Sequence, residues 1–267
     1  TVAAPSVLVA VIDSGLDKAH PDLTLSLFHA PGEVPDNGRD DDGNGLIDDV
    51  SGWNFLTRTA DVSDDIGHGT HVSGTILASG DNAIGVAGVA FGAQLLPLRV
   101  CQQGSCSVSA FAEALLYAKE RGARVANASL GGRHAPVSYE IAAIQAFGDA
   151  GGVLVAAAGN LSSNNDPSPM YPASYELANI VAVAATAADD TLASYSDWGA
   201  LSVDLAAPGT DVLSTFPGGT YRTMSGTSMA TPHVTGAVAL VRSRAPGITA
   251  TDLRQALMSS ATPLPSL

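Results

Sequence analysis

Short apolar runs recur along the chain and predict buried strands. The first, residues 7–12, is continuously apolar and rich in β-branched side chains, which is typical of a strand covered on both faces of a parallel sheet. Similar runs occupy residues 95–100, 125–128, 153–158 and 180–184. We therefore expect these five segments to be strands of one sheet.

Helical patterns lie between the apolar runs. Residues 108–121 and 139–150 predict two helices, and each is followed by a glycine that stops it, Gly122 and Gly151. Alternating strands and helices predict an α/β fold of three layers, in which a mostly parallel, doubly wound sheet is flanked by helices. Ligands bind such sheets beyond the carboxyl ends of the strands, and Asp13 lies at one of these ends.

The last third of the chain predicts two further helices. Residues 226–245 are rich in small and apolar side chains and precede Pro246, a residue that ends helices. Thr249 followed by Asp252 three residues later forms a capping-box pattern. We expect a buried helix that ends before Pro246 and a second helix that begins after Thr249.

Composition limits the domain count and the partners. The chain has 267 residues, 46 % of them hydrophobic, and a formal net charge of −14 from 26 acidic and 12 basic residues. We expect a single domain over residues 1–267, with the acidic, glycine-rich stretch at about 36–52 as an inserted loop. The negative charge argues against nucleic acid and anionic membranes as partners. No apolar run reaches the length of a membrane helix, and we expect a soluble monomer.

The two cysteines, Cys101 and Cys106, are separated by four residues that include Gly104. Neither belongs to the CxxC pair of a structural zinc site, and no histidine is close to them in sequence. A disulfide across a small loop is favoured over two free thiols. If it forms, the protein belongs in an oxidising compartment.

Three short motifs carry candidate catalytic groups: residues 13–15 (Asp-Ser-Gly), 67–71 (Gly-His-Gly-Thr-His) and 226–233 (Gly-Thr-Ser-Met-Ala-Thr-Pro-His). A serine hydroxyl is a poor nucleophile at neutral pH, so acyl transfer needs a base within hydrogen-bond reach and a third group that orients the base. Taken singly, Asp13 is more simply explained as a helix cap and Ser228 as a packing residue. The chemical interpretation depends on the three motifs occurring together.

Together these motifs resemble the signature segments of the subtilisin-like serine proteases, and the resemblance extends over residues 7–263. Their chain order, Asp then His then Ser, separates this family from chymotrypsin-like and α/β-hydrolase enzymes. The resemblance implies the mechanism known from subtilisin: Ser228 attacks the peptide carbonyl, His68 takes and returns the proton, and Asp13 fixes the imidazole tautomer. It also implies a secreted, extracellular endopeptidase that acts on proteins or peptides and is matured by cleavage of its own propeptide.

The oxyanion of the tetrahedral intermediate needs hydrogen-bond donors. Residues 156–160 (Ala-Ala-Ala-Gly-Asn) resemble the family segment whose asparagine supplies a side-chain amide for this purpose. The resemblance implies that Asn160 is this donor, beside the backbone N–H of Ser228. The alternative is an asparagine in an ordinary turn, because Gly-Asn pairs often mark turns.

The resemblance also implies two substrate-binding segments. The first would pair with an extended substrate and comprises Ser129, Leu130, Gly131 and Gly132. The second would complete an apolar S1 pocket and comprises Ala157, Ala158 and Gly159. Met170 falls where some subtilisins have a small residue at the pocket floor, so we expect a shallower or more adaptable S1 pocket. The expected specificity is broad, with a preference for apolar P1 residues.

The acidic loop predicts a structural calcium site. Oxygen-bearing positions alternate in it as at the start of an EF-hand loop, although the twelfth position is Ser51 instead of a bidentate acid. The candidate ligands are Asp40, Asp42, Asn44, Leu46, Asp48 and Asp49. The alternative is a solvated acidic turn without a cation.

Two further cation positions follow from the resemblance alone. Asp22 and Asn82 lie in segments that look like those holding the tight calcium ion of the family, and Asp204 resembles the carboxylate of a weaker cation site. His71 and His233, which follow the catalytic motifs, are expected to be hydrogen-bonded structural residues because no HExxH pattern is present.

Functions other than hydrolysis are possible for such a sequence. A non-catalytic relative would share the fold, but all four chemical positions are filled. A peptide ligase would fill the same positions and stays an alternative, because ligation in place of hydrolysis depends on water access and on the lifetime of the acyl-enzyme. A dinucleotide-binding protein is disfavoured because no GxGxxG follows the first strand. A purely structural calcium-binding module would leave the motif at 226–233 unexplained.

Overall fold

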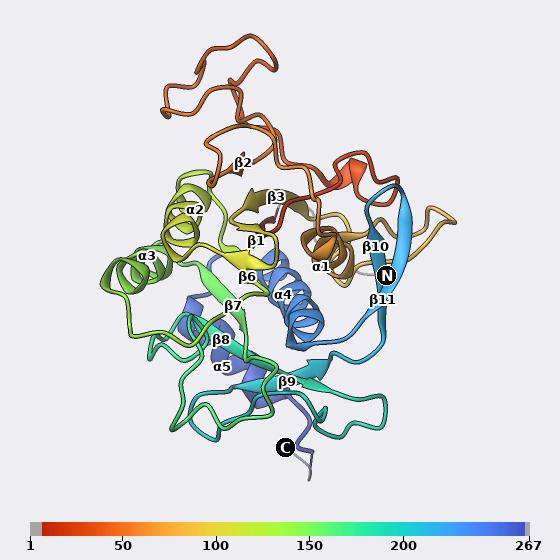
Figure 1. Ribbon diagram of the computed structural model, residues 1–267, viewed down its shortest axis with the longest axis vertical. Helices are drawn as coiled ribbons and strands as arrows, with labels where there is room; N and C mark the ends of the chain where they lie inside the picture. The colour runs from red at the N-terminus through yellow and green to blue at the C-terminus, as the bar shows by residue number, and fades with distance from the viewer. Residues whose placement is uncertain (1–6, 265–267) are drawn as a thin grey trace.

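The computed structural model describes residues 7–264, and its centre is one parallel sheet. Seven strands of the described chain form it in the order β2-β3-β1-β6-β7-β8-β9 (Figure 1). Their bounds are Trp53–Asn54 (β2), Gln94–Arg99 (β3), Leu8–Asp13 (β1), Val125–Ala128 (β6), Val153–Ala157 (β7), Ile180–Thr186 (β8) and Leu205–Pro208 (β9). All five predicted strands are present, and β2 and β9 are additional.

The strand order reverses at β1. This strand pairs in parallel with β3 on one side and with β6 on the other, so that Val9 lies opposite both Leu95 and Val125. Connections leaving neighbouring strands in opposite directions open a crevice at their carboxyl ends. Asp13, the last residue of β1, lies at this crevice.

Helices cover both faces of the sheet, as the alternation of apolar runs predicts. Alternate side chains of β1 divide between two cores: Ile12 packs in one with Phe111 of α2, and Val11 packs in the other with Val72 of α1 and Val234 of α4. Figure 1 shows α2 and α3 on the first side, with α1 and α4 on the second. The helices are His68–Leu77 (α1), Val108–Glu120 (α2), Ser138–Asp149 (α3), Thr227–Arg244 (α4) and Ala250–Ser260 (α5), with a short 3-10 helix at Thr24–Ser26 (η1). The predicted three-layer α/β fold is confirmed.

The ends of the helices agree closely with the signals in the sequence. Ser107 accepts a hydrogen bond from the backbone N–H of Ala110 at the start of α2 (3.3 Å). Thr249 accepts one from Asp252 at the start of α5 (3.0 Å), which is the predicted cap. Each cap satisfies a backbone donor that the helix itself leaves unpaired.

Three smaller features complete the described chain. Two antiparallel hairpins lie outside the main sheet: β4 (Cys101–Gln102) with β5 (Ser105–Cys106), and β10 (Val212–Phe216) with β11 (Thr220–Met224). The acidic segment between η1 and β2 projects from the sheet as a long loop (Figure 1). Among the described helices, none combines the length and the apolarity that a membrane crossing would require.

Candidate active site

A cavity of about 670 Å³ lies over the carboxyl ends of the central strands, and all four predicted chemical residues line it. Asp13 ends β1, His68 begins α1, and Ser228 is the second residue of α4. Asn160 follows β7 by three residues. The fold thus brings together residues that are far apart in the sequence.

Asp13 and His68 form the closest pair in the cavity. The Nδ1 atom of His68 lies 2.8 Å from Oδ1 of Asp13, and the Ser14 backbone N–H donates to the same oxygen at 2.7 Å. The Asp13 side chain is 2 % exposed. Because a carboxylate can only accept, Nδ1 of His68 carries the hydrogen, and the neutral ring has its lone pair on Nε2.

The environment raises the pKa of His68 above its ordinary value of 6.5. Burial by itself lowers this pKa, but the charge of Asp13, its hydrogen bond and the more distant charge of Asp64 together outweigh the effect of burial. His68 therefore becomes a neutral base at a higher pH than an unperturbed histidine does.

Asp64 is a positioning residue that the sequence analysis missed. Its Oδ1 accepts hydrogen bonds from Ser14 Oγ and from the Gly67 backbone N–H, both at 2.8 Å. Its Oδ2 accepts from the Thr70 backbone N–H at 2.8 Å. Gly67 caps α1 and has no side chain to satisfy these donors, so the Asp64 carboxylate replaces the missing cap and holds the first turn, where His68 lies.

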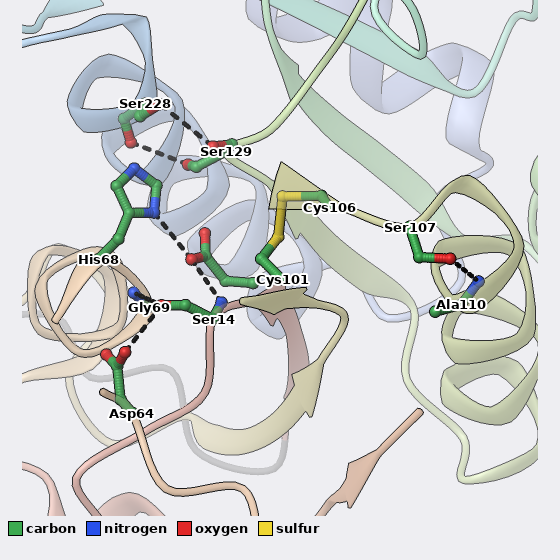
Figure 2. The surroundings of a disulfide bond; sticks show 11 residues. Ser14, Asp64, His68, Gly69, Cys101, Cys106, Ser107, Ala110, Ser129 and Ser228 are labelled. Atoms are coloured by element: carbon green, nitrogen blue, oxygen red, sulfur yellow. Dashed lines mark hydrogen bonds and ion pairs between the residues drawn. A yellow bond between two sulfur atoms is a disulfide. The ribbon is translucent and has the colours of Figure 1, made fainter. Parts of the chain in front are cut away.

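Ser228 is held by a reciprocal pair of hydrogen bonds with Ser129. The Ser228 hydroxyl donates to the Ser129 carbonyl oxygen at 3.1 Å, and the Ser129 hydroxyl donates to the Ser228 carbonyl oxygen at 2.8 Å. Figure 2 shows the His68 ring pointing toward Ser228. In this structure the Ser228 hydroxyl bonds to Ser129 instead of to His68, so proton transfer to His68 requires a rotation of the serine side chain. Catalytic hydrogen bonds are often completed only when substrate binds.

Thr227 orients Asn160. The Asn160 Oδ1 atom accepts from the backbone N–H of Thr227 at 2.8 Å and from its hydroxyl at 3.1 Å. These bonds fix which end of the amide is the oxygen, and no described residue accepts from the Asn160 Nδ2 atom. The amide hydrogens are therefore free to donate into the cavity, next to the first turn of α4, where helical N–H groups are unpaired.

The segment after β6 forms one wall of the cavity. Leu130, Gly131 and Gly132 line it, and Gly132 exchanges two backbone hydrogen bonds with Tyr171, at 2.9 and 3.0 Å. A Cβ atom on Gly131 would lie 3.1 Å from the Tyr171 carbonyl oxygen. A side chain at this position would press on the neighbouring backbone, which would have to shift by a few tenths of an ångström to accept it.

The segment after β7 forms the opposite wall. Ala157 and Gly159 line the cavity, whereas Ala158 is fully buried and is absent from its lining. Met170 lies between the two walls and is 5 % exposed. A Cβ atom on Gly159 would come within 2.8 Å of the Met170 methyl carbon, and one on Gly131 within 3.4 Å of its sulfur. The methionine thus fills space between the two walls, which is consistent with a shallower pocket.

Cys101 and Cys106 form the predicted disulfide, with an S–S distance of 2.03 Å. They face each other across the β4–β5 hairpin, and both line the cavity together with Gly104 and Ser105. Figure 2 shows the disulfide together with Ser14 and His68, which line the same cavity. A covalent bond therefore constrains one border of the cleft.

The acidic loop assembles a different set of carboxylates from the predicted one. The described residues contain one group of acids able to share a metal ion, Glu33, Asp42 and Asp49, whose ligand atoms lie within 4.8 Å of one another. Glu33 was not predicted. Arg121, the residue that follows α2, bonds to both Asp42 and Asp49, so a guanidinium already reaches this cluster.

The other predicted loop residues use their oxygens within the loop. Asp40 accepts from the backbone N–H groups of Gly43 and Gly45, at 2.8 and 2.7 Å. Asp48 accepts from the backbone N–H groups of residues 37 and 38. Asn44 donates to Asp49 at 3.0 Å, while the backbone N–H of Leu46 donates to Asn44 at 2.7 Å. The side-chain oxygens of the residues at EF-hand-like spacing therefore do not point toward one common cation position.

Asp22 and Asn82 are in contact. The Asn82 amide donates to Oδ1 of Asp22 at 2.6 Å, and Oδ2 of Asp22 accepts from the Val86 backbone N–H and the Tyr221 hydroxyl, at 3.1 and 2.8 Å. Both carboxylate oxygens are thus used by donors. For the pair to hold a cation, the Asn82 side chain has to turn its oxygen toward the ion.

Asp204 is bound by other groups. Its carboxylate forms an ion pair with Arg254 and accepts a hydrogen bond from the Ala182 backbone N–H at 2.9 Å. Because the guanidinium neutralises this carboxylate, a cation at Asp204 would have to displace Arg254.

His71 and His233 are hydrogen-bonded to backbone carbonyls. His71 is fully buried, and its Nε2 lies 3.0 Å from the carbonyl oxygens of both Val212 and Arg222. His233 Nδ1 lies 2.9 Å from the Met229 carbonyl oxygen. Burial lowers the pKa of both rings. Their contacts are those of structural histidines.

The comparisons with known proteins agree on one family. The family model described as the subtilase family matches residues 5–266. Subtilisin Savinase of Lederbergia lenta is 40 % identical over 261 residues, covering 97 % of this chain and 85 % of that protein. Thermitase of Thermoactinomyces vulgaris is 37 % identical, covering 95 % of this chain and 80 % of that protein.

The chain spans a smaller share of other relatives. A thermophilic serine proteinase of Bacillus sp. (strain AK1) is 40 % identical, and the match covers 95 % of this chain but 56 % of that protein. Among solved structures, a cold-adapted subtilisin-like serine proteinase has a TM-score of 0.78 and 32 % identity, covering 98 % of this chain and 84 % of that one. The chain therefore belongs to the subtilase family of serine endopeptidases.

Proposed function

We propose that this protein hydrolyses peptide bonds with Ser228 as nucleophile, His68 as general base and Asp13 as the group that orients the base. One observation carries the proposal. The 2.8 Å contact between Asp13 and His68 fixes the tautomer of the imidazole, and both residues line the same cavity as Ser228 and Asn160. This combination of a nucleophile, a base and an acid that orients the base is what acyl transfer by a serine requires.

The reaction begins when the Ser228 hydroxyl turns from Ser129 to His68. Its oxygen attacks the carbonyl carbon while Nε2 of His68 accepts the proton, and the charged ring is stabilised by Asp13. The oxyanion accepts hydrogen bonds from Nδ2 of Asn160 and the Ser228 backbone N–H. His68 then donates its proton to the leaving amine, the C–N bond breaks, and water repeats the sequence on the acyl-enzyme.

The two walls of the cavity support binding of an extended peptide. Gly131 is exposed on the first wall and offers backbone groups to which a substrate strand can pair, whereas the backbone groups of Gly132 are already bonded to Tyr171. Met170 limits the depth of the pocket between the walls, and its flexible thioether adapts to different apolar side chains. We expect broad specificity, with small to medium apolar residues favoured over large aromatic ones at P1.

Calcium is the structural cofactor that the acidic loop would hold, through Asp42, Asp49 and the additional ligand Glu33. Two observations fit a cation there. The Oδ1 atom of Asp49 is buried without a hydrogen-bond partner, and burial raises the pKa of this carboxyl. A bound ion would supply the missing partner and offset the desolvation of the charge, beyond what Arg121 provides. Asp22 and Asn82 are the second proposed site.

The remaining expectations concern the protein as a whole. A disulfide persists in an oxidising compartment, which supports secretion. The names of the relatives, which include a serine proteinase and a subtilisin, favour proteins and peptides as substrates. We further propose that residues 1–267 act as one monomeric domain, and that a propeptide is cleaved during maturation.

Replacement of the nucleophile tests this function. The Ser228→Ala protein should keep its fold by circular dichroism and lose nearly all hydrolysis of casein. Mass analysis of peptide products separates hydrolysis from ligation, because only hydrolysis adds water to each new carboxyl end. Retention of a tenth of the original activity would contradict the assignment of Ser228.

A further inference from the structure

A buried carboxyl group lies on the cleft but has no part in the proposed chemistry. Glu140, in the first turn of α3, lines the same cavity as Ser228 and is 2 % exposed. The acids among the described lining residues are Asp13 and Glu140. Asp13 is bound to His68, whereas Glu140 belongs to no step of peptide hydrolysis.

One oxygen of this carboxyl is fixed and the other is free. The Tyr175 hydroxyl donates to Oε2 of Glu140 at 2.6 Å and accepts from the Val137 backbone N–H at 3.0 Å. The Tyr175 ring also stacks on Tyr171, with centroids 4.2 Å apart. No described residue bonds to Oε1. The carboxyl group is therefore held in place with one acceptor oxygen left for a ligand.

The nearest cationic group does not satisfy Glu140. The Nε2 atom of His134 lies 4.0 Å from Oε2, which is beyond hydrogen-bond distance. The other nitrogen, Nδ1, lies 2.8 Å from the Ala135 carbonyl oxygen and donates to it, so the neutral ring presents only a lone pair toward Glu140. Arg133, the other cation of the lining, faces Asp197 at 3.8 Å.

Burial destabilises the charged form of Glu140 unless a ligand supplies a hydrogen-bond donor. Desolvation raises the pKa of Glu140, against the smaller effects of the Tyr175 hydrogen bond and of His134. A buried carboxyl of this kind gains most from a cationic hydrogen-bond donor. No described residue places such a donor within hydrogen-bond distance of Glu140.

Apolar side chains also line the cavity. Val108 and Phe111 of α2 and Leu130 after β6 line the same cavity as Glu140. Apolar walls with a carboxyl group complement a side chain that has a hydrocarbon stem and a charged head, as lysine and arginine have. The net charge of −14 would also attract cationic peptides at long range.

We propose that Glu140 forms an acidic subsite of the cleft, which selects substrates with a lysine or arginine at one position away from the scissile bond. The inference rests on the proposed function and makes it more specific. Glu140 acts in substrate recognition and not in the chemical step. The alternative, a purely structural role as partner of Tyr175, needs only the oxygen that Tyr175 already uses.

Matched peptides test the subsite without altering the protein. We would measure kcat/KM for fluorogenic peptides that carry arginine or its neutral isostere citrulline, and lysine or norleucine, at each position in turn. At one position the cationic peptide should be favoured by about tenfold or more, chiefly through KM. The preference should weaken with salt, because charge attraction is screened.

Two variants connect the preference to Glu140. Glu140→Gln keeps an oxygen for Tyr175 but loses the charge, so the arginine-to-citrulline ratio should fall toward one at that position only. Asp149→Asn removes a charge from the exposed end of the same helix and should leave the ratio unchanged. Equal rates for arginine and citrulline at every position in the wild type, or an unchanged ratio in Glu140→Gln, would overturn the subsite.

The same experiment separates the two proposals. Cleavage that depends on Ser228 but shows no cationic preference would refute the acidic subsite alone. Absence of any cleavage, or cleavage that persists in Ser228→Ala, would refute the proposed function and the subsite with it.

Discussion

At the scale of single residues, the site depends on pairs in which one side chain orients another. Asp13 orients His68, and Thr227 orients Asn160. The sequence motifs predicted Asp13, His68 and Asn160 because each lies in a recognisable segment. Thr227 belongs to the same motif as Ser228, but its role became visible only when the fold brought it next to Asn160.

Asp64 and Glu140 show why some residues of the site could not be predicted. Asp64 acts on α1 through hydrogen bonds to Gly67 and Thr70, and the only signal in the sequence is an acid shortly before a glycine-capped helix. Glu140 is one acid in an amphipathic helix. Its burial on the cleft follows from how α3 packs, which no local pattern encodes.

The pH dependence of the rate follows from the raised pKa of His68. Because catalysis needs the neutral ring, kcat/KM should rise with pH through a midpoint above 6.5 and stay high in the alkaline range. The effect on stability has the opposite sign: charged His68 stabilises the fold below pH 6.5, and this contribution is lost as the pH rises through the folded-state pKa. A rate maximum at acidic pH would contradict His68 as the base.

Asp64→Asn refines this test, because Asp64 is one of the charges that raise the pKa of His68. The rising limb of the pH–rate profile should move to lower pH in this variant. Asp65→Asn is the matched control: Asp65 is the next residue, but its side chain is 60 % exposed and pairs with Arg99. A profile that moves equally in both variants would indicate an unspecific effect of net charge.

Asn160→Ala should lower kcat by about a hundredfold to a thousandfold with little change in KM, the range established for this kind of donor in subtilisin. The physical reason is that the amide donates mainly to the oxyanion, which exists only in the transition state and the intermediate. Steady-state kinetics on one fluorogenic peptide measure both constants. If the loss occurred in KM alone, Asn160 would be a substrate-binding residue.

At the scale of elements, the apolar runs predicted the strands well because the central strands are buried on both faces. The bounds of β6 coincide with the predicted run, and those of β1, β3 and β7 differ by one residue or so. The two unpredicted strands of the main sheet lack this signal: β2 has two residues and β9 is half-exposed at the end of the sheet order. An edge strand needs no continuous apolar run.

The acidic loop could be predicted as an element but not in its contacts. Alternating acids gave a ligand set that included Asp40 and Asp48, yet both use their oxygens to bind backbone N–H groups of the loop itself. Glu33 lies before the alternating stretch, and Arg121 comes from the C-terminal end of α2, where it follows the helix. Spacing along the chain says nothing about a partner that another element supplies.

The β4–β5 hairpin gives a prediction about substrate binding. Cys101→Ser combined with Cys106→Ser removes a ring whose loop-closure entropy is worth about 2 kcal/mol. Because the hairpin borders the cleft, KM should rise more than kcat falls. Reductant should reproduce this change in the wild type and have no effect on the double variant. An unchanged KM in both cases would mean that the hairpin does not contact substrate.

At the scale of the whole molecule, the account predicts that calcium stabilises the fold. A ligand that binds only the native state at a hundred times its Kd adds about 2.7 kcal/mol, and each kcal/mol moves the Tm of a chain of this size by roughly 2–4 °C. EDTA should therefore lower the Tm by about 5–10 °C per site. The Ser228→Ala protein is the right material, because the active enzyme would digest its own unfolded fraction.

Variants in the Ser228→Ala background assign the effect to a site. Asp42→Ala should reduce the calcium-dependent increment in Tm if the acidic loop binds the ion, and Asp22→Ala should do so for the second proposed site. Asp149→Asn, which lies outside both, is the control. Equal melting temperatures in millimolar calcium and in excess EDTA would show that Arg121 suffices to neutralise the loop.

The central claim is that Ser228 is an activated nucleophile, and labelling with a fluorophosphonate probe tests it most directly. Such probes phosphonylate a serine only when a neighbouring base and oxyanion donors activate it. Peptide mapping of the wild type should locate one probe on Ser228, and the Ser228→Ala protein should take up none. Labelling should follow the same rise with pH as hydrolysis, since both need neutral His68. A wild-type protein that hydrolyses casein while Ser228 stays unlabelled, or a probe that is found on another residue, would contradict the account.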